Sequence, residues 1–358
     1  MPVNGAGVPG MFDYLSGVGD CRTSSSRRHR CRGDVVPSDL KHIFTVAVLS
    51  AVTATSCSSS IPATDPTAAR APIVAFVESG GVRIRVHSVG PAKARETLVV
   101  IHGGPGLSLE SLENLDVLAG PDRRVVSYDQ RGAGQSSKPD DSDYRLDAQL
   151  SDLEAVRKWT GAGKVDVLGQ SWGGLLASAY TALHPDRVRS LVLLDAAPLD
   201  WTEFLAGQQR FAARETQLRA EGLVAATLPP DEGDSCLPGL LARIPVYLAR
   251  PDGPAPPLHT TCTTSATLAT FAAVRTSIGQ AQLTQLADRL ADYRGRALVI
   301  MGREDPFGLG WLERCVQLLE GARVEQLIVA GSGHLSSLER PEVAIPAIDI
   351  WLHAGAAS

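Results

Sequence analysis

Short apolar runs that alternate with helical patterns constrain the fold of this chain more than any other feature. The runs lie at Leu98–Ile101, Val125–Val126, Val165–Leu168, Leu191–Leu194, Leu298–Met301 and Leu327–Val329, and helical patterns lie at Leu146–Trp159, Trp172–Leu183 and Leu312–Leu319. Most of the runs have strand length and are rich in β-branched residues, which is typical of parallel strands covered on both faces. The alternation predicts a doubly wound α/β sheet.

Two further features define the domain organisation. Alternating runs at Ile73–Glu78 and Val82–Val89 flank Ser79-Gly80-Gly81 and predict a hairpin. Between Leu194 and Leu298, helical stretches and Pro-rich turns replace the strand runs, and a structureless loop of this length would be unusual. We therefore expect a core of residues 72–197 and 291–358, interrupted by a mostly helical cap of residues 198–290.

Residues 1–71 precede this core. A Gly-, Ser- and Arg-rich head is followed by Lys41-His42, an apolar run at Ile43–Val52, small residues and Cys57. This order resembles a bacterial export signal in which Cys57 is lipidated, and the run is too short to cross a bilayer. We expect a disordered head, a signal and a tether, with the natural start downstream of Met1 and the protein anchored to the outer face of the cell membrane. The alternatives are a secreted protein without lipid and a cytoplasmic protein.

Charge and cysteine content restrict the partners and the chemistry. The chain has 34 Lys and Arg against 39 Asp and Glu, a net charge of -5, so a nucleic-acid partner is not expected. In an oxidising compartment Cys236 and Cys262 could form a disulfide, with Cys315 as a buried thiol on a helix. Alternatively, all three are small apolar residues. No C-x-x-C spacing indicates a metal site.

The sharpest local motif is Gly169-Gln170-Ser171-Trp172-Gly173, which follows one predicted strand and precedes a predicted helix. A strand-to-helix turn this tight requires small residues on either side of its central residue. The motif predicts that Ser171 is a nucleophile.

A serine nucleophile requires a base and an acid that orients the base. His334 follows the last predicted strand in a Gly-rich loop, where open α/β sheets place their sites, whereas His353 lies on the last predicted helix and is expected at the surface. For the acid, Asp305 follows the strand at Leu298–Met301 and is favoured over Glu304, with Asp195 as the runner-up. The order Ser171, Asp305, His334 is typical of this kind of sheet.

Attack on a carbonyl also requires two preset donors for the oxyanion. The backbone N–H of Trp172, directly after the nucleophile, is the expected first donor. The second is expected in His102-Gly103-Gly104-Pro105-Gly106, where Gly104 is favoured and Gly103 is next. His102 is expected to form structural hydrogen bonds.

Three motifs together resemble the α/β-hydrolase superfamily and, within it, the proline iminopeptidase branch. They are His102-Gly-Gly-Pro-Gly106, Asp129-Gln-Arg-Gly-Ala-Gly-Gln-Ser136 and Gly169-Gln-Ser-Trp-Gly-Gly174, and the resemblance covers the chain from about Ile73 to Leu352 apart from the cap. It implies an α/β-hydrolase fold with a mostly parallel eight-stranded sheet, helices on both faces and an inserted helical cap. It also implies that Arg131 and Ser136 stabilise the fold.

The leading functional hypothesis is a serine aminopeptidase that releases N-terminal residues, often proline, from short peptides through an acyl-enzyme. Cap carboxylates would then bind the substrate amine; Glu203, Glu215, Glu221 and Glu232 are the candidates considered. A carboxylester or lactone hydrolase with the same triad is the alternative, favoured by the acid-free cap stretches Leu237–Leu248 and Leu258–Leu283. A third hypothesis is a non-catalytic surface-binding lipoprotein. No nucleotide, redox or metal cofactor is implied, and the sequence leaves the oligomeric state open.

Overall fold

The computed structural model describes residues 72–140, 142–277 and 279–356, and the statements below refer to these residues. The expectations for residues 1–71, including the export signal and the lipidation of Cys57, lie outside them. Among the described helices, none combines the length and the apolar character needed to cross a membrane.

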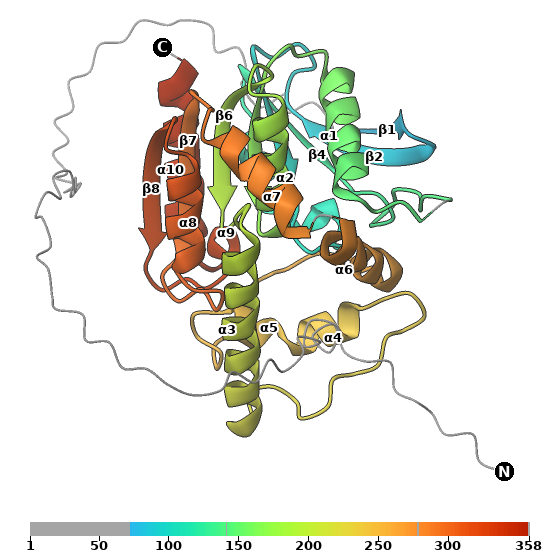
Figure 1. Cartoon of the computed structure of the whole chain (residues 1–358), viewed down its shortest axis with the longest axis vertical. Coiled ribbons are helices and arrows are strands. Elements are labelled where there is room, and N and C mark those ends of the chain that lie inside the picture. Colours follow the sequence, from blue (N-terminus) through green and yellow to red (C-terminus); the bar gives the residue numbers. More distant parts are fainter. Residues whose placement is uncertain (1–71, 141, 278, 357–358) are drawn as a thin grey trace, which may run out of the picture. The chain divides into compact units, whose positions relative to one another are not determined.

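A single sheet of eight strands forms the centre of the fold, in the order β1-β2-β4-β3-β5-β6-β7-β8 (Figure 1). β1 pairs antiparallel with β2, β2 pairs antiparallel with β4, and the other pairs are parallel. The strands are β1 (Ile73–Ser79), β2 (Val82–Val89), β3 (Glu96–Ile101), β4 (Arg123–Tyr128), β5 (Val165–Gln170), β6 (Val188–Leu194), β7 (Arg296–Gly302) and β8 (Arg323–Val329). The predicted hairpin and the mostly parallel sheet are confirmed.

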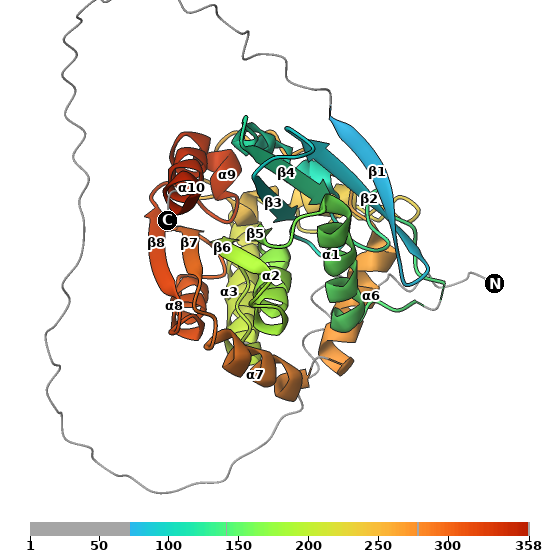
Figure 2. The same cartoon turned by 90° about the horizontal axis from the view of Figure 1, so that it is seen from above.

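Helices cover both faces of the sheet, because the central strands are buried on both sides (Figure 2). On one face lie α1 (Leu146–Thr160), α2 (Trp172–Leu183) and α8 (Gly310–Leu318), and on the other lie the 3-10 helix η1 (Leu109–Leu118), α9 (Ser336–Glu339) and α10 (Pro341–Ala356). Leucines of η1 and the apolar residues Ile348 and Trp351 of α10 form one hydrophobic core with side chains of the central strands.

The strand register brings the functional loops together. Gln170 at the end of β5 lies opposite Leu194 at the end of β6, and Leu194 lies opposite Ile300 of β7. Gly302 at the end of β7 lies opposite Val329 at the end of β8. The loops that follow these four strands therefore all begin at the carboxyl-terminal end of the sheet.

The segment between β6 and β7 is mostly helical, with longer non-helical stretches at residues 221–236 and 248–263. It contains α3 (Trp201–Ala220), α4 (Leu237–Ala242), α5 (Ile244–Tyr247), α6 (Thr264–Ser277) and α7 (Gly279–Leu290). Asp200 caps α3 by accepting a hydrogen bond from the backbone N–H of Glu203 at 2.9 Å. Figure 1 shows α3, α4 and α5 beyond the end of the sheet toward which β8 points, whereas α7 packs against α2 of the core. The first three helices thus lie beside the loops that leave the strands.

Candidate active site

Ser171 lies in the turn between β5 and α2 with φ of 53°, a left-handed conformation that is costly for a residue with a side chain. Two glycines make this turn tight. A Cβ atom at Gly169 would lie 2.2 Å from the carbonyl oxygen of Gly173, and a Cβ at Gly173 would lie 2.2 Å from that of Ile101. The glycine spacing noted in the sequence is therefore a steric requirement of the turn.

Three side chains from separate loops form one hydrogen-bonded chain. The hydroxyl of Ser171 lies 2.8 Å from Nε2 of His334, and Nδ1 of His334 lies 2.7 Å from Oδ2 of Asp305. The other oxygen of Asp305 accepts the backbone N–H of Phe307 at 2.8 Å. With Nδ1–H donated to Asp305, Nε2 is left to accept the serine proton. This arrangement can activate a hydroxyl for attack on a carbonyl.

Both partners of the imidazole–carboxylate pair are buried, His334 at 2% and Asp305 at 6% exposure. Burial alone lowers the pKa of His334, but the negative charge and the hydrogen bond of Asp305, with further carboxylates nearby, outweigh it and raise the pKa above the usual value. The site is therefore built to stabilise a positive charge on His334.

Asp195, the runner-up for the orienting acid, has a different position. Its carboxylate accepts the backbone N–H of Gly302 at 3.0 Å and both the backbone N–H and the hydroxyl of Ser336, at 2.9 and 2.7 Å. Burial, followed by the charge of Asp305, raises the pKa of Asp195. Asp195 thus joins the loops after β6, β7 and β8, and Asp305 is the residue on Nδ1 of His334.

Trp172 and Gly103, two of the residues expected as oxyanion donors, lie next to Ser171. As the first residue of α2, Trp172 has a backbone N–H that no residue of its own helix can accept. A Cβ at Gly103 would lie 3.1 Å from the Cβ of Ser171 and 2.3 Å from Oε1 of Gln170, so the loop after β3 passes directly beside the nucleophile. Gly104 follows with φ of 117°, which only glycine adopts readily.

Hydrogen bonds of His102 and Gln130 fix the loop after β3. Nδ1 of His102 donates to the carbonyl of Gly103 at 2.8 Å, and Nε2 accepts the backbone N–H of Gln130 at 3.1 Å. The side-chain oxygen of Gln130 in turn accepts the indole N–H of Trp172 at 3.1 Å. Burial lowers the pKa of His102, so a neutral imidazole fits both contacts. His102 has the structural surroundings expected from its position.

The Asp129–Ser136 segment also makes buried contacts. Arg131 binds Asp152 through two hydrogen bonds of 2.7 and 2.8 Å. The hydroxyl of Ser136 donates to the carbonyl of Asp129 at 2.7 Å and accepts the backbone N–H of Arg85 at 2.8 Å. These contacts connect the segment after β4 to α1 and β2.

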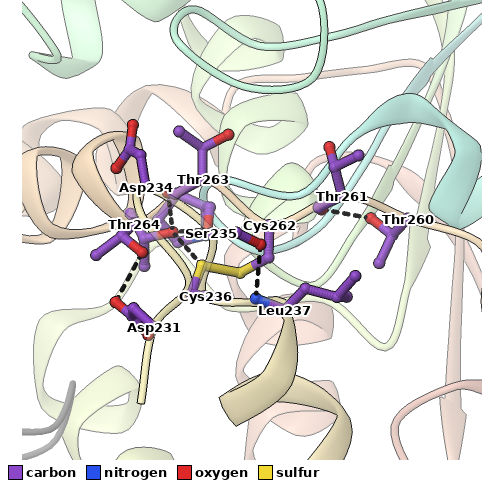
Figure 3. Close-up of a disulfide and its surroundings, with 12 residues drawn as sticks. Asp231, Asp234, Ser235, Cys236, Leu237, Thr260, Thr261, Cys262, Thr263 and Thr264 are labelled. Atoms are coloured by element: carbon purple, nitrogen blue, oxygen red, sulfur yellow. Dashed lines mark hydrogen bonds between the residues drawn. A yellow bond between two sulfur atoms is a disulfide. The ribbon is translucent and has the colours of Figure 1, made fainter.

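A disulfide between Cys236 and Cys262 joins two cap segments that lie far apart in the sequence (Figure 3). Cys262 also forms an isolated antiparallel β-bridge with Leu107. Next to it, the backbone N–H of Thr263 donates to the carbonyl of Gly106 at 2.8 Å. The disulfide, one of two alternatives in the sequence, is therefore present and lies beside the glycine loop of the site. Cys315 is the buried free thiol that the sequence predicted.

Aromatic rings from the cap and the core surround His334. The ring of Phe307 lies 4.6 Å from the imidazole, that of Tyr247 on α5 at 5.8 Å and that of Trp311 on α8 at 6.1 Å, between centroids. None of these three residues belongs to a motif that is recognisable in the sequence. The position of Phe307, two residues after Asp305, was the only sequence signal, because ring packing depends on the placement of the cap.

Three of the four cap glutamates considered for the substrate amine have side-chain partners within the protein. Glu203 forms an ion pair with Arg210, and Glu215 forms ion pairs with Arg219 and Arg243. Glu221 accepts from Gln217 at 2.8 Å, and Glu232 is exposed. In the described part of the chain, no group of three or more His, Cys, Asp and Glu is placed to hold a metal ion.

Parts of the chain are similar in sequence to curated proteins. Over 136 residues the chain is 41% identical to a proline iminopeptidase of Lactobacillus helveticus, a match that covers 36% of this chain and 46% of that protein. A 38% match to a proline iminopeptidase of Lactobacillus acidophilus covers 38% of this chain and 49% of that protein. The chain thus spans about half the length of the curated relatives it matches.

Solved structures match over a larger share of the chain. A proline iminopeptidase of Mycobacterium smegmatis superimposes with a TM-score of 0.58 and 22% identity, over 80% of this chain and 100% of that one. An esterase of Exiguobacterium antarcticum superimposes with a TM-score of 0.55 and 21% identity, over 78% of this chain and 100% of that one. At these identities the likeness concerns the fold.

The family assignment follows from the fold and from one further match. The sequence profile of the alpha/beta hydrolase fold matches residues 96–341, which include β3 to β8 and the loops of the site. The chain therefore belongs to the α/β-hydrolase fold family.

Proposed function

We propose that the protein is a serine hydrolase that works through an acyl-enzyme. The observation that carries this proposal is the hydrogen-bonded chain from Ser171 through His334 to Asp305. His334 removes the proton from Ser171 as its oxygen attacks the substrate carbonyl, and Asp305 orients and stabilises the imidazolium. His334 then protonates the leaving group, and a water molecule activated by the same imidazole hydrolyses the acyl-enzyme.

The negative charge that develops on the carbonyl oxygen needs preset donors. We assign this role to the backbone N–H groups of Trp172, the first residue of α2, and Gly104, which belongs to the loop after β3. At Gly103, the residue before Gly104, a Cβ atom would lie 2.3 Å from Oε1 of Gln170, so this loop runs close to the turn that carries Ser171.

For the substrate, we propose peptides with a free N-terminus, from which the enzyme releases the first residue, often proline. The support comes from the curated relatives, which are named proline iminopeptidases and share about 40% identity with this chain over the matched part. To receive the substrate amine, Glu203, Glu215 or Glu221 would have to give up a partner within the cap, whereas Glu232 is exposed.

A carboxylester or lactone hydrolase is the second candidate, and a specific observation favours it. Glu203 and Glu215, two of the acids considered for the amine, already have arginine partners within the cap. A substrate without a charged amine would leave these ion pairs intact, and the aromatic rings beside His334 offer an apolar surface.

One set of assays separates the two candidates. The protein is tested on a proline arylamide with a free amine, on its N-acylated counterpart and on a short-chain aryl ester, with Ser171→Ala as the control. Turnover of the free-amine amide alone supports the aminopeptidase, and turnover of the ester alone supports the esterase. Hydrolysis that survives Ser171→Ala would overturn the catalytic assignment.

We also propose that the protein is exported and anchored through Cys57. The Cys236–Cys262 disulfide supports an oxidising compartment, because such bonds are rare in the cytosol. In a bacterial host, Cys57→Ala should move the protein from the membrane fraction to a soluble one. An unchanged fractionation would contradict the anchor.

A further inference from the structure

The loop that carries His334 donates its backbone N–H groups, one after another, to side-chain carboxylates and to one carbonyl of the cap. The recipients are Glu304 for Gly331 and Ser332 (3.0 and 3.2 Å), Glu339 for Gly333 and Leu335 (2.8 and 3.3 Å), the carbonyl of Tyr247 for His334 (2.7 Å) and Asp195 for Ser336 (2.9 Å). The six consecutive backbone N–H groups from Gly331 to Ser336 therefore all donate to acceptors that lie outside the loop.

Glu339 differs from the other carboxylates because it also binds the cap. Its Oε1 atom accepts the N–H groups on either side of His334, and its Oε2 atom accepts the backbone N–H of Ala249 at 2.8 Å. Ala249 follows α5, whose last residue, Tyr247, accepts the N–H of His334. The cap chain after α5 and the His334 loop are thus joined at two neighbouring points, one of which is Glu339.

The carboxylate of Glu339 is partly buried and accepts three backbone N–H groups. Burial raises the pKa of Glu339 above its usual value, and the three N–H donors and the nearby His334 oppose part of that rise. Three carboxylates act on the imidazole of His334 from different elements: Asp305 after β7, Asp195 after β6 and Glu339 on α9. Asp305 contacts the ring directly, whereas Glu339 contacts the backbone on both sides of it.

We propose that Glu339 is a positioning residue that joins the cap to the His334 loop and, through its negative charge, favours the imidazolium form of His334. The proposal rests on the proposed function, in which His334 is the general base. It assigns Glu339 two effects that can be separated: alignment of the base and stabilisation of its protonated form.

Glu339→Gln in the full chain tests both effects. An amide can accept on one side only, so either Ala249 or the pair Gly333 and Leu335 then faces an N–H₂ group. We expect kcat/KM to fall about tenfold, because a hydrogen bond to a charged, partly buried group is lost. We also expect the acid limb of the kcat/KM profile to move to lower pH by about 0.5 unit, because a negative charge near His334 is removed.

Two matched variants control for effects other than those of Glu339. One tests the loss of a surface charge near the loop, and the other tests a weaker hold on the backbone of the His334 loop. Glu342→Gln removes an exposed carboxylate close in sequence that pairs with Arg340, and it should leave both rate and profile unchanged. Glu304→Gln removes the negative charge from the group that accepts two amides of the same loop, but this group does not act on the imidazole, so the acid limb should stay in place. If the acid limb of the kcat/KM profile shifts by the same amount in Glu304→Gln and Glu339→Gln, the proposal is overturned.

An NMR titration of the His334 ring supplies a readout that does not need turnover. A lower pKa of His334 in Glu339→Gln supports the proposal, and an unchanged pKa refutes it. If the wild-type protein hydrolyses none of the assay substrates, the proposed function fails on that result alone. The NMR titration still decides the role of Glu339.

Discussion

Removal of the Cys236–Cys262 disulfide should destabilise the protein measurably. The bond spans 26 residues of sequence, and closing a loop of that size removes about 12 cal/mol/K of entropy from the unfolded chain, or about 3.5 kcal/mol at 25 °C. A folded part of roughly 280 residues unfolds with an entropy of about 0.6 kcal/mol/K. The double variant Cys236→Ala/Cys262→Ala should therefore melt about 6 °C lower than the wild-type protein.

The same variant should also impair the site. The segment from Cys262 to Thr263 pairs with Gly106 and Leu107, so a loosened cap segment releases one side of the loop that contains Gly104. We expect kcat for the best substrate of the assay set to fall, while the far-ultraviolet circular dichroism stays that of an α/β protein.

Calorimetry with and without dithiothreitol provides the measurement. Reduction of the wild-type protein should reproduce the melting temperature of the double variant, and dithiothreitol should have no effect on the variant itself, which controls for the other cysteines. Burial raises the pKa of the Cys315 thiol to about 12, so this residue stays protonated during the assay. A wild-type protein that melts at the same temperature when mass spectrometry shows the bond to be reduced would refute the reasoning.

Three further predictions concern the core and the base. Gly169→Ala should destabilise the protein and abolish hydrolysis, because the new Cβ meets backbone atoms of Gly173; soluble, active variant protein would contradict the steric argument. Arg131→Met should cost about 3–5 kcal/mol in urea unfolding, because it leaves Asp152 buried without its cation, and a loss below 1 kcal/mol would argue against a structural role. Because the pKa of His334 is raised and only the neutral imidazole accepts a proton, hydrolysis should decline as pH falls through a midpoint above about 6.5. An acid limb centred below that value would contradict the assigned charge environment.

The elements of the core could be predicted from the sequence because their signals are local. Strands buried on both faces require continuous apolar runs, and β3, β5 and β6 coincide with such runs. The turn at Ser171 needs glycines at two set positions, since any Cβ there meets backbone atoms. His334 and Asp305 could be selected because they directly follow strands whose ends meet at one edge of the sheet.

Other features depended on tertiary structure. Asp195 and Asp305 both follow neighbouring parallel strands, and only the three-dimensional arrangement places one on the imidazole and the other on backbone amides. The pairing of Cys236 with Cys262 depends on the path of the cap chain, which has no periodic pattern to reveal it. In the sequence, Glu339 cannot be told from any surface acid on a short helix. Its role becomes visible only in the structure, where it accepts the backbone N–H of Ala249 from the cap. Local patterns thus determined the strands and the nucleophile, whereas contacts between distant segments decided how the base is held, because such contacts leave no regular trace in the sequence.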